Sequence, residues 1–189
     1  MSNEKKTIRG KHLVWMDVEM SGLDPKTAVI LELACIVTDN ELNVVAEAPV
    51  YVVHQPLSLL EGMDDWNREH HTASGLWDRV LASTSTIGQI DDELVRFLSR
   101  YMEPNTSPLC GNSIGQDRRF LFEYMPKLSA FLHYRNVDVS SLKELAARWY
   151  PELPEFRKDN NHRALDDIRE SIEELRWYRE RIMVRSASA

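Results

Sequence analysis

Two acidic residues interrupt the first apolar segment of the chain, and this interruption constrains the fold more than any other feature of the sequence. Residues 12–20 read HLVWMDVEM, so Asp17 and Glu19 lie among large apolar side chains. Side chains two residues apart on a β-strand point to the same face, which puts both carboxylates on the face shared with Trp15. The segment is therefore predicted to be a strand that carries two neighbouring acids near its C-terminal end.

A simpler interpretation is that the two acids lie on the solvated face of an edge strand. Such a strand alternates polar and apolar residues, whereas this one is apolar on both faces until the acids appear. Burying two like charges is costly unless a positive charge compensates for them. Divalent cations do so economically, and oxygen ligands favour Mg²⁺ or Mn²⁺. Two such ions together carry four positive charges, so two further acids are expected.

Asp117 is the candidate for the third acid. It opens a predicted helix directly after the segment CGNSIG, at the kind of strand end where α/β proteins bind ligands. A surface acid that begins a helix is the ordinary alternative for such a residue. Asp138, in the short segment NVDV, is a rival for the fourth acid, but no histidine or helix stripe positions it.

Helix periodicity selects the fourth acid from the pair Asp166 and Asp167. The apolar stripe of the predicted helix is centred on Ile168. At about 100° per residue, Asp167 lies beside this stripe and Asp166 lies nearly opposite it, so Asp167 is expected to face inward. His162 stands near the predicted helix start, where its ring would overhang whatever Asp167 binds. A structural or surface role is the usual alternative for a lone histidine.

The pattern of the whole chain predicts an α/β fold. Three segments rich in β-forming residues (12–20, 29–38 and 44–54) are joined by short turns, as in an antiparallel meander. The later elements are predicted at 57–82 (helical or irregular), 87–102 (helix, Thr86 as N-cap), 108–114 (strand), 118–132 (helix), 136–139 (strand), 142–149 (helix, Ser141–Glu144 capping box) and 162–183 (helix). This order predicts a mixed five-stranded sheet flanked by helices.

Composition bounds the size and the location of the protein. The chain has 189 residues, 43% of them apolar, which suits a single domain over residues 1–189 with a core of about 12–184 and a polar tail at 185–189. No apolar run suggests a membrane span or a secretion signal. Cys35 and Cys110 match no metal-binding or disulfide pattern and are expected to be reduced core residues of a cytoplasmic protein.

The net charge limits the kind of nucleic acid that the chain would bind. A formal charge of −7 excludes a broad basic face along which a long phosphate backbone would bind. A nucleic-acid ligand would therefore be short, and the chain would contact it locally.

Three motifs together resemble the DEDDh 3'-to-5' exonuclease superfamily, whose fold is ribonuclease H-like. They are DVE at 17–19, GNSIGQD ending at Asp117, and HRALDD, which contains His162 and Asp167 in the pattern H-x-A-x-x-D. Longer segments over about residues 12–184 are similar to the bacterial oligoribonuclease family; they are DVEMSGLDP, MDDWN, HTASGLWDRV, CGNSIGQDRRFLFEYMP and DDIRESIEELRWYRE. The loop at 151–161 matches least.

The resemblance implies hydrolysis of very short RNA, especially dinucleotides, from the 3' end to nucleoside 5'-monophosphates. Two Mg²⁺ or Mn²⁺ ions would be held by Asp17, Glu19, Asp117 and Asp167. His162 would act as the general base, because an imidazole with an ordinary pKa near 6.5 accepts a proton at neutral pH.

The resemblance also implies substrate contacts. Leu23 would wedge against a base and Trp66 would stack on one, with core packing as the alternative for both. The 5' phosphate of a dinucleotide would be held by His71, Tyr134, Arg135 and Ser140, with Ser113 as a further substrate contact. Tyr134, counted with His162 as catalytic, and Arg135 would come from the second protomer of a homodimer. Arg135 taken alone would more often be a surface charge.

Three other functions remain open at this point. A related DEDDh exonuclease would use the same catalytic set to trim longer RNA or DNA 3' ends. A ribonuclease H-like module would bind nucleic acid without catalysis. A purely structural dimer would carry the acids as surface charges.

Overall fold

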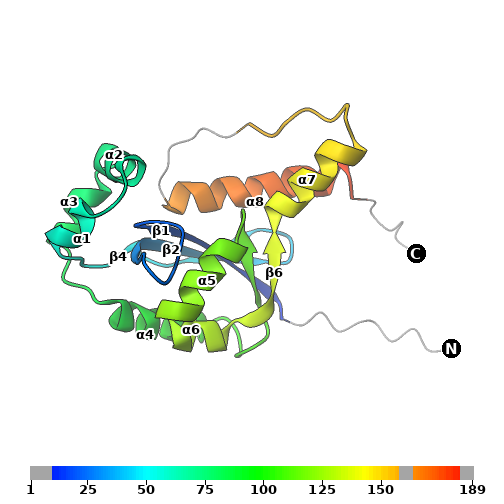
Figure 1. The fold of residues 1–189 in the computed structure, drawn as a ribbon. Helices are drawn as coiled ribbons and strands as arrows, with labels where there is room; N and C mark the ends of the chain where they lie inside the picture. The colour runs from blue at the N-terminus through cyan, green and yellow to red at the C-terminus, as the bar shows by residue number, and fades with distance from the viewer. Residues whose placement is uncertain (1–9, 158–163, 184–189) are drawn as a thin grey trace.

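A computed structural model describes residues 10–157 and 164–183 of the chain (Figure 1). His162 and the predicted tail at 185–189 lie outside the described residues. The strands are β1 (His12–Met20), β2 (Ile30–Asp39), β3 (Val44–Glu47), β4 (Tyr51–Val52), β5 (Pro108–Gly111) and β6 (His133–Asp138). The helices are α1 (Leu57–Glu61), α2 (Asp65–Ala73), α3 (Leu76–Ala82), α4 (Ile87–Leu98), α5 (Gly115–Tyr124), α6 (Pro126–Phe131), α7 (Val139–Trp149) and α8 (Ala164–Arg181).

The sheet confirms the predicted mixed topology. Its strand order is β3-β2-β1-β5-β6, with β1, β2 and β3 antiparallel and with β1, β5 and β6 parallel. The predicted strand at 44–54 is two strands, because β3 and β4 pair separately with β2. Pro49 lies between them, and a proline has no N–H to donate to a sheet ladder. The sheet therefore has five strand positions, one of which is interrupted.

Helices cover both faces of the sheet, and this arrangement explains the alternation of side chains along β1. Val14, Met16 and Val18 pack on the face covered by α4, α5 and α6. Trp15 packs on the opposite face, against residues of α7 and α8. Figure 1 shows α7 and α8 on one side of the sheet and α4 to α6 on the other. Asp17 and Glu19 continue the Trp15 series and therefore point to the α8 side.

A third layer of short helices lies beside β2. The helices α1, α2 and α3 occupy the segment predicted to be helical or irregular, and α1 and α3 pack on Leu31 through Leu60, Leu76 and Val80. Figure 1 shows this layer at the end of the sheet nearest the start of α8. The arrangement brings α2 close to the end of β1 that carries the acids.

Several element boundaries differ from the predictions for local reasons. The predicted helix at 118–132 is two helices, because Pro126 lacks the N–H of a helix interior and begins α6 instead. Asp138, not Ser141, caps α7, since its carboxylate accepts from Ser140 N at 3.0 Å. The Ser141–Glu144 capping box is therefore wrong. Thr86 is confirmed as the N-cap of α4 and forms a capping box with Gln89.

Both cysteines are free and buried, as predicted. Burial raises the pKa of the Cys35 thiol to about 12 and raises the pKa of Cys110 further. Within the described residues, no helix has both the length and the apolar character needed to cross a bilayer.

Candidate active site

Strand β1 and helix α8 bring three carboxylates together. Asp17 and Glu19 project from the end of β1, and Asp167 projects from the first turn of α8. One oxygen from each of the three lies within 4.8 Å of the others. Asp166 instead pairs with Arg169 at 3.2 Å, so the expectation that Asp167 is the inward-facing acid is confirmed.

Asp117 reaches the same strand from the other side of the sheet. It lies in the first turn of α5, is 6% exposed, and accepts from the backbone N–H of Val18 at 3.0 Å. Val18 stands between Asp17 and Glu19 in the chain, so this bond fixes Asp117 next to both acids. The long separation of 99 positions between Asp117 and Val18 is closed by the parallel pairing of β1 with β5.

Burial is the main cause that makes two of the four acids, Glu19 and Asp117, hard to ionise. Burial raises the pKa of Glu19 to about 7, and the charges of Asp167, Glu32 and Asp117 act in the same direction. Burial also raises the pKa of Asp117 to about 7, against the lowering effect of its backbone hydrogen bonds. Carboxylates that resist ionisation in this way are stabilised by a nearby cation. A set of oxygen donors alone fits Mg²⁺ or Mn²⁺.

Asp138, the predicted rival, is used for structure instead. Its Oδ1 accepts from the backbone N–H groups of Ser113 and Ser140, each at 3.0 Å. These bonds join the loop after β5 to the start of α7. Ser113 and Ser140, both predicted to contact substrate, are thereby brought together, with their hydroxyl oxygens 3.2 Å apart. Ser113 has a φ of 50°, and in this left-handed conformation its N–H donates to Asp138 Oδ1 and to Ser140 Oγ.

Leu23 and Trp66 are not core residues, which removes the alternative considered for both. Leu23 is 77% exposed in the loop after β1, and Trp66 is 67% exposed on α2. The Trp66 ring stacks on His70, with the ring centroids 4.8 Å apart and the planes 7° from parallel. Both side chains are open to an incoming base.

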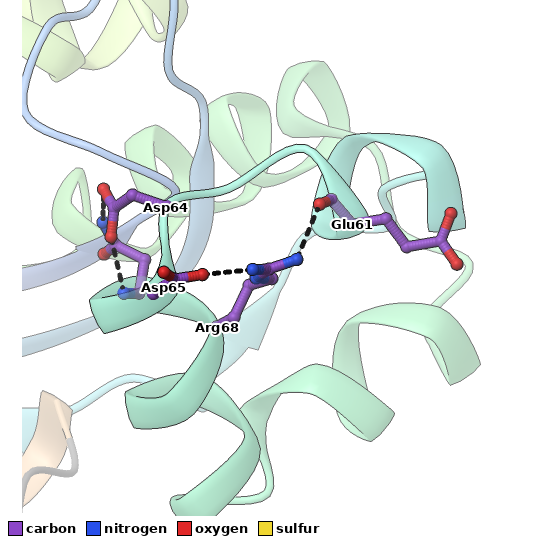
Figure 2. A network of polar contacts seen from close by, with 5 residues as sticks. Glu61, Asp64, Asp65 and Arg68 are labelled. Atoms are coloured by element: carbon purple, nitrogen blue, oxygen red, sulfur yellow. Dashed lines mark hydrogen bonds and ion pairs between the residues drawn. The ribbon is translucent and has the colours of Figure 1, made fainter.

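Helix α2, which carries Trp66, has a firmly fixed start. Figure 2 shows Asp64 capping the helix and Arg68 reaching both Asp65 and the carbonyl of Glu61. The Asp64 carboxylate accepts from Asn67 N at 2.9 Å and from Asn67 Nδ2 at 2.7 Å. A side-chain cap of this kind stabilises a helix by about 1 kcal/mol.

The contact predicted between His71 and a substrate phosphate stays a prediction. The side chain is 2% exposed, and its Nε2 lies 2.9 Å from the backbone oxygen of Met20. The contact with Met20 O therefore fixes the ring beside the end of β1 that carries Glu19.

Tyr134 and Arg135 lie on β6, the edge strand of the sheet. Tyr134 is 70% exposed, and its hydroxyl accepts from Arg135 Nε at 3.1 Å. Arg118 of α5 holds this strand by donating to His133 O at 2.9 Å and to Asn136 Oδ1 at 2.6 Å. Both predicted residues therefore form an exposed cationic and aromatic pair at a supported sheet edge.

Glu32 and Arg79 belong to the site but were not selected from the sequence. Glu32 pairs with Glu19 across the β1–β2 ladder, is 3% exposed, and forms an ion pair with Arg79 Nη2 at 2.7 Å. Arg79 also counteracts the rise in the pKa of Glu19. A signal was present, because Glu32 interrupts the apolar segment ILELACIV just as Asp17 and Glu19 interrupt theirs.

Comparisons with known proteins agree with one another. A family model for RNase T, described as Exonuclease, matches residues 14–175. An oligoribonuclease of Alcanivorax borkumensis is 59% identical over 175 residues, which cover 92% of this chain and 97% of that protein. An oligoribonuclease of Pseudomonas aeruginosa is 54% identical over 171 residues, which cover 90% of this chain and 95% of that protein.

Solved structures support the fold. A structure of exonuclease I, reported for how it achieves processivity, has a TM-score of 0.67 at 16% identity and covers 91% of this chain and 41% of that chain. An Escherichia coli exonuclease I in complex with a 5cy-dA13 oligonucleotide has a TM-score of 0.64 at 16% identity, and covers 91% of this chain and 41% of that chain. Likeness at this level of identity shows the ribonuclease H-like exonuclease fold alone.

Proposed function

The chain belongs to the RNase T exonuclease family and, within it, to the oligoribonucleases, which are 3'-to-5' exoribonucleases. From this premise we propose its substrate and mechanism. The substrate is a very short oligoribonucleotide, above all a dinucleotide. The products are nucleoside 5'-monophosphates. The observation that carries the proposal is the convergence of Asp17, Glu19 and Asp167 within 4.8 Å, next to an Asp117 bonded to the same strand.

The four acids would hold two divalent cations, Mg²⁺ or Mn²⁺. Their oxygen-only donor set suits these ions, and bound cations would offset the burial and the neighbouring negative charges that raise the pKa of Glu19. When bound, the ions supply a water of lowered pKa and neutralise charge at the scissile phosphate. Asp17, Glu19, Asp117 and Asp167 contribute by binding and orienting these ions from fixed positions on β1, α5 and α8.

His162 is the proposed general base. It precedes Asp167 by five residues and stands two residues before the first described residue of α8. An imidazole of ordinary pKa is neutral in most molecules at pH 7 and accepts a proton from water without a large energetic cost. After the products leave, the imidazolium of His162 releases this proton to solvent.

Two exposed apolar side chains, Trp66 and Leu23, contact the two bases of a dinucleotide. Trp66 presents a stacking surface, and base stacking on an aromatic ring contributes about 1–3 kcal/mol per base. Leu23, in the loop after β1, lies between the two bases and separates them. Because stacking does not depend on hydrogen-bond donors, this arrangement accepts any base.

The 5' phosphate is held by Ser113, Ser140, Tyr134 and Arg135, and it sets the length of the substrate. Ser113 and Ser140 offer adjacent hydroxyls in one protomer. Tyr134 and Arg135 act from the edge strand of the second protomer of a homodimer. His71 completes this set, and the contact of its Nε2 with Met20 O fixes its ring beside the end of β1. A dinucleotide fills the space between the metal site and this phosphate cap, whereas a longer chain cannot engage the cap.

The charge of the protein agrees with a short substrate. The net charge is −7, so long polymers gain little from general attraction to the surface. A dinucleotide needs only the cations at one phosphate and a few local donors at the other.

Initial rates on 5'-labelled RNA dinucleotides and heptamers, measured with Mn²⁺, test this proposal. We expect kcat/KM to be at least about 10-fold higher for the dinucleotide, a difference of about 1.4 kcal/mol that one good phosphate contact supplies. The Asp117→Asn variant serves as the inactive control and should release no mononucleotide. Equal or greater efficiency on the heptamer would instead identify an exonuclease that trims longer 3' ends. Absence of mononucleotide at saturating Mn²⁺ would identify a binding module.

A further inference from the structure

Glu19 belongs to a second group of potential ligands besides the carboxylate cluster. One ring nitrogen from each of His70 and His71, together with an oxygen of Glu19, forms a set whose members lie within 4.8 Å of one another. Both histidines come from α2, and Glu19 comes from β1. Neither histidine is among the proposed ligands of the catalytic cations. The layer of short helices thus places two imidazoles against one of the catalytic acids.

The hydrogen bond of His71 determines which of its nitrogens is available. Nε2 lies 2.9 Å from Met20 O, and a carbonyl oxygen only accepts, so Nε2 carries the hydrogen. Nδ1 is then the nitrogen with the lone pair. This atom is buried in a side chain that is 2% exposed, and it has no hydrogen-bond partner among the residues that the structure describes.

A buried lone pair of this kind is unusual unless something occupies it. Unsatisfied buried polar atoms are rare in folded proteins because each costs about 1–3 kcal/mol. Histidines that bind metals almost always donate their other N–H to a backbone carbonyl or a carboxylate, which fixes the tautomer and the ring orientation. His71 has this arrangement through Met20.

The donor set differs in kind from the carboxylate cluster. Two imidazoles and one carboxylate form a ligand set that Zn²⁺ and Co²⁺ prefer, whereas Mg²⁺ and Ca²⁺ prefer oxygen alone. Bonds of about 2.0–2.1 Å place tetrahedral ligand atoms roughly 3.4 Å apart. The ring of His70, which would have to adjust to that spacing, stacks on the exposed Trp66.

We propose that Glu19, His70 and His71 form a metal site for Zn²⁺ or a cation of similar chemistry, and that its occupation inhibits the enzyme. The inhibition rests on the proposed function, because Glu19 is also a ligand of the catalytic cations. A zinc ion bound by the histidines takes Glu19 away from the carboxylate cluster. It also fixes His70, which supports the base-stacking face of Trp66.

Cobalt binding to the metal-free full-length chain tests the site independently of activity. Four- or five-coordinate Co²⁺ with nitrogen ligands absorbs visible light far more strongly than Co²⁺ in an octahedral oxygen site. We expect an intense band in the parent protein that Zn²⁺ displaces. The variant His70→Phe keeps an aromatic ring against Trp66 but lacks one metal ligand. Loss of a ligand's hydrogen-bond partner lowers metal affinity by up to roughly 100-fold, and we expect loss of the ligand itself to lower the Co²⁺ affinity by more than that.

A matched control variant separates the site from general histidine binding. His54 is exposed in the loop after β4 and lies outside both ligand groups, so His54→Phe should bind Co²⁺ like the parent. Equal Co²⁺ affinity in His70→Phe and His54→Phe would overturn the proposal. If His70→Phe is misfolded by circular dichroism, ring-nitrogen NMR of the parent decides. Zn²⁺ should then shift the Nδ1 resonance of His71, and an unchanged resonance at saturating Zn²⁺ refutes the site.

Kinetics test the inhibition. With Mn²⁺ supporting dinucleotide hydrolysis, added Zn²⁺ should inhibit the parent and His54→Phe, and the concentration for half inhibition should rise at least about 10-fold in His70→Phe. Identical inhibition of all three proteins would place zinc in the carboxylate cluster alone. If Mn²⁺ supports no hydrolysis by the parent, the proposed function fails, while the cobalt spectra still decide whether the metal site exists.

Discussion

At the scale of single residues, the site depends on carboxyl groups that burial makes hard to ionise. The pKa values of Glu19 and Asp117 are both raised to about 7, from ordinary values of 4.5 and 3.8. Their neighbours are chiefly other acids, and Arg79 is the cation that acts on Glu19. Without a bound cation, the folded protein therefore keeps these protons at pH values where the unfolded chain has released them.

This difference predicts how stability depends on pH. Between about pH 4 and 7 the folded chain binds more protons than the unfolded chain, so the free energy of unfolding falls as the pH rises. Glu19→Gln removes one of the two groups. Urea titrations with a chelator at pH 5 and pH 8 measure the free energy of unfolding. Between these pH values, we expect this free energy to fall by ~2 kcal/mol less in the variant than in the parent. Saturating Mn²⁺ should restore the parent at pH 8, and parallel losses in both proteins would contradict the expectation.

At the scale of the elements, the first turn of α5 joins three separate parts of the site. Gln116 donates through Nε2 to the carbonyl of Leu23 at 2.5 Å, Asp117 accepts from Val18 N, and Arg118 donates to His133 O of β6. Farther along the helix, the Tyr124 hydroxyl lies 2.8 Å from Pro25 O and 2.7 Å from Ala28 O. One helix thus aligns the loop that carries Leu23 with the metal cluster.

The loop contacts predict a defect that depends on the substrate. In Gln116→Ala and Tyr124→Phe, the backbone of the Leu23 loop loses a fixed donor, and a hydrogen bond of this kind contributes about 1 kcal/mol. We expect kcat/KM for a dinucleotide to fall roughly 5-fold in each variant. Hydrolysis of the 4-nitrophenyl ester of thymidine 5'-monophosphate should not change, since this ester has no second base for Leu23 to separate.

A spectrophotometric assay with that ester provides the control for the loop variants. Phe122→Ala supplies a matched substitution on α5, because the Phe122 side chain is 75% exposed. Equal losses on the ester and the dinucleotide would show that the loop contacts act through the metal cluster instead.

At the scale of the whole molecule, three layers meet at one end of the sheet. Strand β1 supplies Asp17 and Glu19, α8 supplies Asp167, and the short helices supply Trp66 and the ion pair of Arg79 with buried Glu32. The exposed Tyr134 and Arg135 lie on the edge strand β6, two strands away from β1 in the sheet. The proposed phosphate cap would therefore be supplied by a second copy of the chain, which is a prediction that complementation can test.

Complementation between two inactive variants tests this shared site. Tyr134→Ala/Arg135→Ala lacks the phosphate cap and Asp17→Asn lacks a metal ligand, so each homodimer should be inactive on dinucleotides. After random mixing of the protomers of a two-fold dimer, about one quarter of the sites are complete, and activity should recover to that fraction of the parent. Recovery confined to samples that sediment as dimers supports the sharing. Absence of recovery in mixed dimers would place all substrate contacts within one protomer.

Much of the site follows from local periodicity. The two-residue repeat of β1 puts Asp17 and Glu19 on one face, and the helical repeat of α8 distinguishes Asp167 from Asp166. These directions are properties of the backbone itself, so they are readable from nearby residues. The same reading failed at Pro49 and Pro126, where a missing N–H divided a predicted element in two, although both prolines are visible in the sequence.

The sequence by itself therefore determined the strand that carries the acids, the face on which they lie and the family to which the chain is similar. The tertiary structure alone decided that Asp117 bonds to Val18, that His71 is buried, and that Glu32 faces Glu19 with Arg79 as its partner. The physical reason is range. Side-chain direction repeats with the local backbone, whereas burial and pairing depend on which distant segments the packing of the core brings together.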